Sequence, residues 1–188
     1  ETILQRPPYT LIANSDFFLM DSRSQYILTI RDVTELQRLE KNIRYKLSKT
    51  GLTATHHFED IKTVDEGMKH VIRQAEVMAR YSAPILIQGE SGTGKELFAQ
   101  SIHNASPCSK GPFVTFDCAA HSPEQEAALS RAGKAADTGT LYLDNLDQLT
   151  PGGQRVLCRL LREGVVHVQG ENTPTPVAAR VIGSLTGD

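Results

Sequence analysis

One stretch of seven residues carries the clearest chemical signal in this 188-residue chain. It combines three glycines and one lysine at fixed spacing, in the order Gly89-Glu90-Ser91-Gly92-Thr93-Gly94-Lys95. Glycines let a backbone turn tightly, so that several N–H groups can point at one anion. Lys95 adds a full positive charge that can reach the terminal phosphates of a nucleotide. The pattern G-x-x-x-x-G-K therefore predicts a phosphate-binding loop.

The segments that flank this loop are typical of a strand and a helix. Apolar residues fill positions 84–87 before the loop, and a helix-like segment covers 96–102 after it. This context is what a phosphate-binding loop requires, and the positive end of the helix adds attraction for an anion. A glycine-rich turn with an incidental lysine is the alternative, but it leaves the flanking segments unexplained. Glu96 stands where most such loops carry Ser or Thr to hold Mg²⁺.

A second acidic group follows an apolar run later in the chain. The run is Leu141-Tyr142-Leu143, and Asp144 comes directly after it. Such a strand carries its acid to the carboxyl end of the sheet, where Asp144 can hold Mg²⁺ or its water shell. The pattern is weak alone, but at this distance after the loop it predicts the second half of a P-loop ATPase site.

Strands and helices alternate around these two motifs. Apolar periodicity predicts helices over 66–81 and 123–136 and a third from Thr150 to Gly164. The third helix is expected to bury one face, lined by Val156, Leu157, Leu160 and Leu161. Apolar and β-branched runs predict strands over 113–117 and 177–184 and a strand or hairpin arm over 165–168. The alternation predicts a three-layer α/β core of the P-loop NTPase type with a parallel sheet.

The first third of the chain has a different pattern. Three short strands are predicted at 9–13, 17–20 and 26–30, separated by turn-forming residues at 14–16 and 21–24. Residues 32–35 offer capping groups for a helix that Gly51 ends. Its apolar stripe, Leu36, Leu39, Ile43 and Leu47, is explained equally by packing on the small sheet and by dimerisation of a signalling helix.

Composition narrows the class of protein. A formal net charge of -2 gives no global basic field for nucleic acid. The three cysteines lack metal-binding spacing and predict reduced thiols in a cytoplasmic protein. No apolar run is long enough for a membrane span and no signal peptide opens the chain.

His56 and His57 are expected to be solvated linker residues, and His167 a strand residue rather than a catalyst. The missing initiator Met suggests a piece of a longer protein.

The loop and the residues after it, Gly89 to Leu97, resemble the Walker A motif of sigma-54-dependent bacterial enhancer-binding transcriptional regulators. Other matches to the AAA+ domain of this family run over residues 58–184, and Glu96 is its usual residue after the lysine. Upstream, residues 31–35 resemble the end of a PAS sensor domain that leads into a linker helix. The resemblance implies a PAS-like portion at 1–33, a linker helix at 34–57 and a truncated AAA+ core at 58–188.

The same resemblance implies cofactors and partners. ATP or ADP with Mg²⁺ would bind at Gly89 to Leu97, and Phe58 and Ile61 would border the adenine. Glu96 and Asp144 would support Mg²⁺ through water. RNA polymerase holoenzyme containing sigma-54 is the implied partner, and the full-length form is expected to be a homo-oligomer. DNA would be contacted only through a module that this chain does not contain.

Several positions depart from the family's pattern. Residues 119–138 form a short segment without the G-A-F-T-G-A loop with which the family grips the sigma factor. The family's Walker B ends Asp-Glu, where this chain has Asp144-Asn145. The family's Asn that restrains that Glu aligns with Asp117, so carboxylate and amide are exchanged. Ser184-Leu185-Thr186 replaces a further Ala-Thr-Asn motif.

These departures leave two interpretations of hydrolysis open. In one, Asp117 takes over activation of the attacking water. In the other, which we favour, hydrolysis has decayed while nucleotide binding persists, because an amide cannot accept a proton and a working base must lie within about 3 Å of its water. The favoured function is thus an ATP-binding regulator fragment with weak or absent hydrolysis and no sigma-gripping loop. The alternatives are an active ATPase that remodels the polymerase holoenzyme, a P-loop small-molecule kinase, and a dimerisation module built on the linker helix.

Overall fold

The computed structural model describes residues 2–6, 9–20, 23–35, 52–120 and 124–187. The chain divides into two compact units, Glu1–Lys46 and Leu47–Asp188. Within the described ranges, no helix is long and apolar enough to cross a membrane.

The first unit is an antiparallel sheet of three strands in the order β1-β2-β3. The strands are β1 (Thr2–Arg6), β2 (Tyr9–Met20) and β3 (Arg23–Asp32). The predicted turn at 14–16 is wrong, because β2 runs through it and pairs Asn14 with Thr29 and Asp16 with Ile27. Ladder hydrogen bonds from a neighbouring strand override the local turn preference of such residues. The strand β1 was not predicted.

A helix begins directly after β3, at Thr34 and Glu35. The Asp32 carboxylate accepts hydrogen bonds from the backbone N–H and the hydroxyl of Thr34, at 2.9 and 2.5 Å. The predicted capping role of this segment is therefore confirmed at Asp32. The apolar stripe of Leu36, Leu39, Ile43 and Leu47 and the stop at Gly51 lie outside the described residues and stay predictions.

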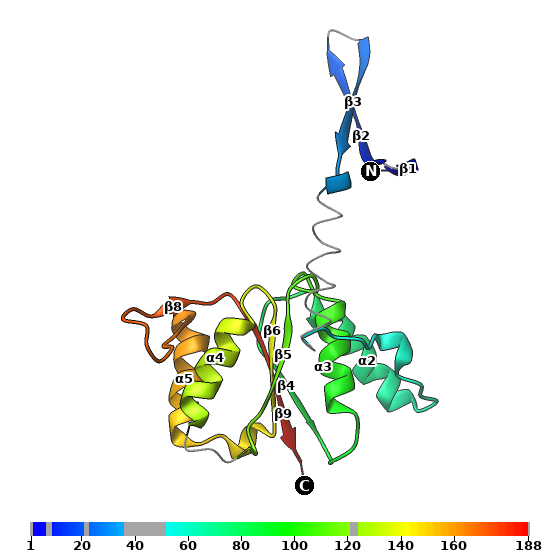
Figure 1. The fold of residues 1–188 in the computed structure, drawn as a ribbon. Coiled ribbons are helices and arrows are strands. Elements are labelled where there is room, and N and C mark those ends of the chain that lie inside the picture. The colour runs from blue at the N-terminus through cyan, green and yellow to red at the C-terminus, as the bar shows by residue number, and fades with distance from the viewer. Residues whose placement is uncertain (1, 7–8, 21–22, 36–51, 121–123, 188) are drawn as a thin grey trace. The chain divides into compact units, whose positions relative to one another are not determined.

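The second unit is a three-layer α/β fold, as predicted (Figure 1). Its sheet contains β4 (Ile85–Gly89), β5 (Phe113–Asp117), β6 (Thr140–Asp144) and β9 (Arg180–Thr186). These strands are all parallel and lie in the order β4-β9-β6-β5. One face carries α2 (Glu66–Ala79) and α3 (Lys95–Asn104), and the other carries α4 (Gln125–Ala135) and α5 (Pro151–Glu163).

Alternation along the strands produces one hydrophobic core on each face of this sheet. On β6, Leu141 and Leu143 pack with side chains of α4 and α5, while Tyr142 between them packs with side chains of α2 and α3. All three are 0% exposed. The central strands β6 and β9 are covered on both faces and are therefore buried along most of their length, whereas the outer strands β4 and β5 keep exposed positions.

Helix α5 begins and ends at the predicted residues. Thr150 caps it by accepting a hydrogen bond from Gly153 N–H at 3.2 Å, and Gly164 closes it with a φ of 65°. Val156 and Leu160 are buried as expected, but Leu161 is 47% exposed. The prediction for Leu161 is wrong because the buried stripe of this helix is narrower than the four-residue pattern suggests.

Two short helices and a hairpin complete the described part of the unit. The 3₁₀ helix η1 covers Phe58–Asp60 and η2 covers Leu146–Gln148. The predicted strand at 165–168 is an arm of a hairpin, in which β7 (Val165–Val166) pairs with β8 (Thr175–Pro176). His56, His57 and His167 are exposed.

A buried arginine joins the sheet to α2. Arg180, the first residue of β9, is 6% exposed, and its terminal nitrogens donate to the carbonyl oxygens of Ala79 and Met78, both at 2.8 Å. Both carbonyls lie in the last turn of α2, where i+4 helical partners run out, and the guanidinium supplies a charged donor to each. Met78 O also accepts a hydrogen bond from Tyr81 N–H at 3.1 Å. Burial lowers the pKa of the Arg180 guanidinium. No carboxylate pairs with this side chain in the described part of the unit.

We expect Arg180→Met to lower the free energy of unfolding by about 2–4 kcal/mol, because two carbonyl oxygens lose their charged donor. Urea denaturation of both proteins measures the difference. The matched control is Arg73→Met on the exposed side of α2, which should change the value by less than about 0.5 kcal/mol. Equal effects of the two substitutions would contradict the role of Arg180 in holding α2 to the sheet.

Candidate nucleotide-binding site

The phosphate loop joins the end of β4 to the start of α3. Gly92 and Gly94 have φ angles of 79° and 84°, a conformation that strains residues with a side chain. Thr93 folds back on the loop, where its hydroxyl donates to the Glu90 carbonyl oxygen at 2.8 Å. The loop is therefore closed on itself by local contacts, with the amino end of α3 directly behind it.

Lys95 is the first residue of α3 and is half-buried. Its Nζ donates to the carbonyl oxygens of Gly89 and Glu90, at 3.0 and 2.9 Å. The ammonium group thus spans the mouth of the loop. Together with the free N–H groups at the start of the helix, it concentrates positive charge at one point, which suits a phosphate.

A mainly apolar cavity of about 250 Å³ adjoins the loop. Its lining comes from α2, β4, the loop and α3, and consists of Met68, Val71, Ile87, Gln88, Gly89, Thr93, Lys95 and Phe98. Phe58 contacts this region edge-on, with its ring centroid 6.5 Å from that of Phe98. Phe58 and Ile61 are both partly buried against the same core. They line a neighbouring hollow rather than the cavity itself.

Asp144 ends β6, and two hydroxyl groups converge on one of its oxygens. The Ser184 hydroxyl donates to Asp144 Oδ1 at 2.5 Å, and the Tyr142 hydroxyl donates to the same atom at 3.1 Å. Burial raises the pKa of the Tyr142 phenol, and the Asp144 charge raises it further, so Tyr142 keeps its proton and acts as a donor. Sequence reasoning missed this role of Tyr142, although strand alternation places residues two apart on one face.

The exchanged pair, Asp117 and Asn145, is in direct contact. The Asn145 side-chain amide donates to Asp117 Oδ1 at 3.0 Å, and the backbone N–H of Ala119 donates to the same oxygen at 2.9 Å. These hydrogen bonds, that from Asn145 foremost, lower the pKa of the Asp117 carboxyl. Asp117 and Asp144 are paired in register on β5 and β6. The two acidic residues therefore lie side by side at the carboxyl ends of β5 and β6.

The remaining predicted residues lie around the loop. Glu90, Ser91 and Glu96 are exposed, and Leu97 is half-buried. The Glu96 carboxylate follows Lys95 in the first turn of α3 and accepts a hydrogen bond from Gln100 at 3.1 Å. Among the described residues, no group of three or more His, Cys, Asp and Glu side chains forms a direct metal site.

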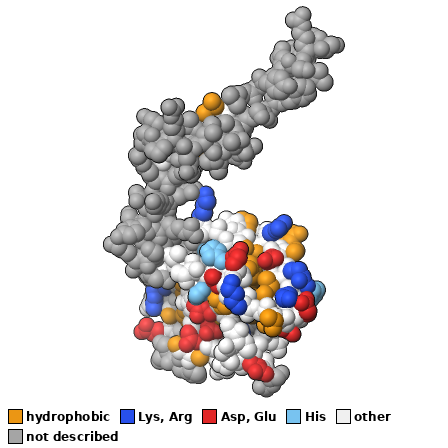
Figure 2. Space-filling view, turned by 90° about the vertical axis from the view of Figure 1, so that its right-hand side faces the viewer, with side chains coloured by type: hydrophobic (Ala, Val, Ile, Leu, Met, Phe, Trp, Pro, Cys, Tyr) orange, Lys and Arg blue, Asp and Glu red, His pale blue; other side chains and the backbone are white. Residues whose placement is uncertain are grey.

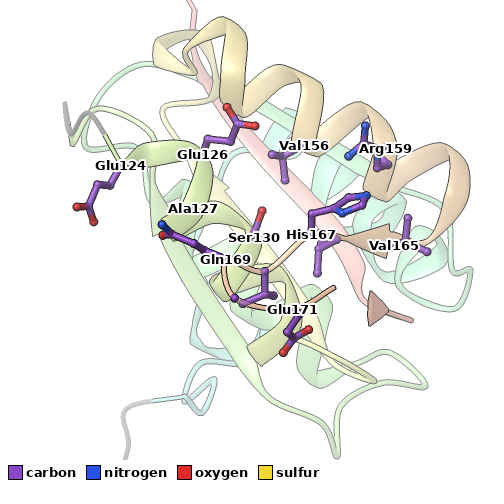
Figure 3. A pocket seen from close by; sticks show the side chains of 13 residues that line it. Glu124, Glu126, Ala127, Ser130, Val156, Arg159, Val165, His167, Gln169 and Glu171 are labelled. Atoms are coloured by element: carbon purple, nitrogen blue, oxygen red, sulfur yellow. The ribbon is translucent and has the colours of Figure 1, made fainter. Parts of the chain in front are cut away.

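A second hollow lies on the other side of the sheet, between α4, α5 and the β7–β8 hairpin (Figure 3). Its volume is about 460 Å³, and Ser130, Arg159 and His167 are among its lining residues. It contains none of the residues predicted for the site. Figure 2 shows Lys and Arg side chains intermixed with Asp and Glu on the visible described face, in keeping with the small net charge.

Comparisons with known proteins show which family this chain is similar to. A family model described as the Sigma-54 interaction domain matches residues 61–130 and 125–188. The transcriptional activator RocR of Bacillus subtilis is 38% identical over 174 residues, which are 84% of this chain and 37% of RocR. The regulatory protein TyrR of Salmonella typhimurium is 33% identical over 181 residues, which are 87% of this chain and 33% of TyrR. The chain thus spans about a third of the length of these relatives.

A solved structure has the same fold. NtrX from Brucella abortus in complex with ADP superposes with a TM-score of 0.65 at 27% identity, covering 82% of this chain and 36% of NtrX. The complex of NtrX with ATP gives the same TM-score and identity and covers 83% of this chain. The family model covers more than half of the chain. The chain belongs to the family of sigma-54 interaction domains.

Proposed function

We propose that this chain is the ATP- or ADP-binding part of a transcription regulator. The observation that carries the proposal is the closed loop, where Lys95 and the start of α3 present positive charge at the carboxyl edge of a parallel sheet. The structures of NtrX with ADP and with ATP support it by analogy. The phosphates would lie on residues 89–95, with Leu97 behind the loop and the base toward Phe58 and Ile61.

The residues at the sheet edge fit a magnesium ion held through water. Mg²⁺ prefers oxygen ligands and usually keeps several waters, and the carboxylates of Asp144 and Glu96 supply oxygens beside the loop. When bound, the ion would neutralise charge on the phosphates. Asp144 would orient one of its waters, because Oδ1 is already held by two donors and Oδ2 has no donor among the described residues.

We expect weak or absent ATP hydrolysis because of the residues beside Asp144. Asn145 stands where the family carries its general base, and an amide cannot accept a proton. Asp117 is the nearest replacement, but hydrogen bonds from Asn145 and Ala119 hold its pKa below the ordinary value. A carboxylate stabilised in this way is a poorer base, so we favour decay of hydrolysis over a new role for Asp117.

Regulation without the sigma-gripping loop is the second part of the proposal. Helix α4 runs unbroken over Gln125–Ala135, and four residues then lead to β6. The family model matches in two segments that meet within this helix, which supports a shortened chain here. Contact with RNA polymerase holoenzyme would need another surface. Active remodelling, the alternative, would need the missing loop and base.

The remaining assignments are proposals about the longer protein. We assign residues 1–33 to a PAS-like portion, 34–57 to a linker helix and 58–188 to the AAA+ core. The regulator would act in the cytoplasm as a homo-oligomer and would contact DNA through a module outside this chain. The names of RocR and TyrR describe transcriptional regulators, which supports the regulatory role alone.

The proposed function leads to three predictions, of which the first concerns nucleotide binding. Lys95→Ala should weaken ATP binding roughly 10- to 100-fold, because charge-assisted hydrogen bonds to phosphate are lost. Isothermal titration calorimetry measures the change. Lys69→Ala is the control, since Lys69 forms an exposed pair with Glu66 on α2, and its affinity should stay within about twofold. Unchanged affinity in Lys95→Ala would argue against this site.

The second prediction concerns hydrolysis by the natural chain. Phosphate release at saturating ATP should match that of Lys95→Ala, and neither Asp117→Ala nor Asn145→Ala should lower it. A coupled phosphate assay decides the matter. Measurable turnover that Asp117→Ala abolishes and Asn145→Ala retains would instead assign the base to Asp117.

The third prediction reverses the exchange. The double substitution Asp117→Asn with Asn145→Glu places the carboxylate where the family has it and keeps the hydrogen bond between the two positions. Turnover should rise on the order of 10²-fold, the lower range for a positioned general base. Asn145→Glu alone should gain less, since it places two carboxylates in contact. No gain in the double variant would show that the lost base is not the limiting defect.

A further inference from the structure

Two buried hydroxyl groups hold one oxygen of Asp144. Ser184 and Tyr142 are each 0% exposed, and they reach Asp144 Oδ1 at 2.5 and 3.1 Å. They come from different strands, β9 and β6. Two donors from separate elements restrict rotation of a carboxylate more than a single contact does, because both angles must be kept at once.

The Ser184 hydroxyl accepts one hydrogen bond and donates another. The N–H of Asn145 donates to Ser184 Oγ at 3.3 Å. A carboxylate oxygen accepts, so the Ser184 hydroxyl donates its single proton to Asp144 while one of its lone pairs accepts from Asn145. Asn145 is itself held by its side-chain contact with Asp117. The chain of contacts thus runs across the ends of β5, β6 and β9.

The Tyr142 hydroxyl is held by the packing of its ring. The ring stacks on Phe113 with centroids 5.9 Å apart and an interplanar angle of 20°. Because the ring is enclosed in the core under α2 and α3, its hydroxyl reaches the sheet edge at one place. A phenylalanine could fill the same core volume, so the hydroxyl adds a polar function that packing does not require.

Ser184 also lies toward the phosphate loop. The strand β9 runs between β4 and β6, and Ser184 is in register with Ile87, two residues before Gly89. Ser184 therefore lies between β4, the strand that ends in the phosphate loop, and β6, the strand that ends in Asp144.

We infer that Ser184 and Tyr142 are positioning residues that fix Asp144 Oδ1, so that Oδ2 is presented to a magnesium-bound water. This inference rests on the proposed nucleotide site and names two residues that set its dependence on Mg²⁺. The competing explanation is that the hydroxyls are satisfied core groups that stabilise the fold alone.

The experiment compares ATP affinity in Mg²⁺ with affinity in EDTA for the natural chain, Ser184→Ala and Tyr142→Phe. In each variant the gain in affinity from Mg²⁺ should fall roughly 10-fold, the lower range for partners of a metal-binding carboxylate. Affinity in EDTA should stay within about twofold, because the loop and Lys95 are intact.

Thr140→Val is the matched control. Thr140 lies at the other end of β6, is 0% exposed, and its hydroxyl contacts His103 at 2.8 Å. Its loss should reduce stability without changing the ratio of the two affinities. Variants that keep the natural ratio, or lose affinity equally with and without Mg²⁺, would overturn the positioning role while the proposed function stands. A natural chain that binds no ATP would overturn both.

Discussion

Parallel pairing of four strands is the constraint on which the candidate site depends. Because parallel strands point the same way, their carboxyl ends meet at one edge, and residues far apart in the chain are brought together there. The register pairs Asp117 with Asp144 and Gly89 with Thr186. Covered by helices on both faces, the sheet has little freedom to slip, so this edge is a rigid frame for the loop and the acids.

Nucleotide binding and hydrolysis place different demands on this frame. Binding uses backbone N–H groups, a helix end and Lys95, which depend on loop geometry more than on any one side chain. Hydrolysis depends on a single group with a suitable pKa at one point. Under the proposed function, the exchange of carboxylate and amide between Asp117 and Asn145 would leave the first set of features intact and remove the second.

The acids at the sheet edge are held by a chain of polar contacts. Asn145 links the two carboxylates, through its side chain to Asp117 and through its backbone to Ser184 and Asp144. Each contact satisfies a polar group at the margin of an apolar core, where an unpaired group is costly. The hydrogen bonds that satisfy these polar groups are the same ones that orient Asp144. Stability alone therefore does not distinguish the two roles, whereas the dependence of ATP affinity on Mg²⁺ does.

Local sequence patterns determined much of this structure. The glycine loop, the caps of α5 and the buried strands depend on neighbouring residues and on periodicity, and the chain alone predicted them. Tertiary structure decided the rest, because it depends on partners distant in sequence. The turn expected at 14–16 is a strand because β3 pairs with it, and Leu161 is exposed because of how α5 packs. Two further features depend on the register of β5, β6 and β9, which no local preference encodes. They are the contact between Asp117 and Asn145 and the hydrogen bonds that Tyr142 and Ser184 donate to Asp144.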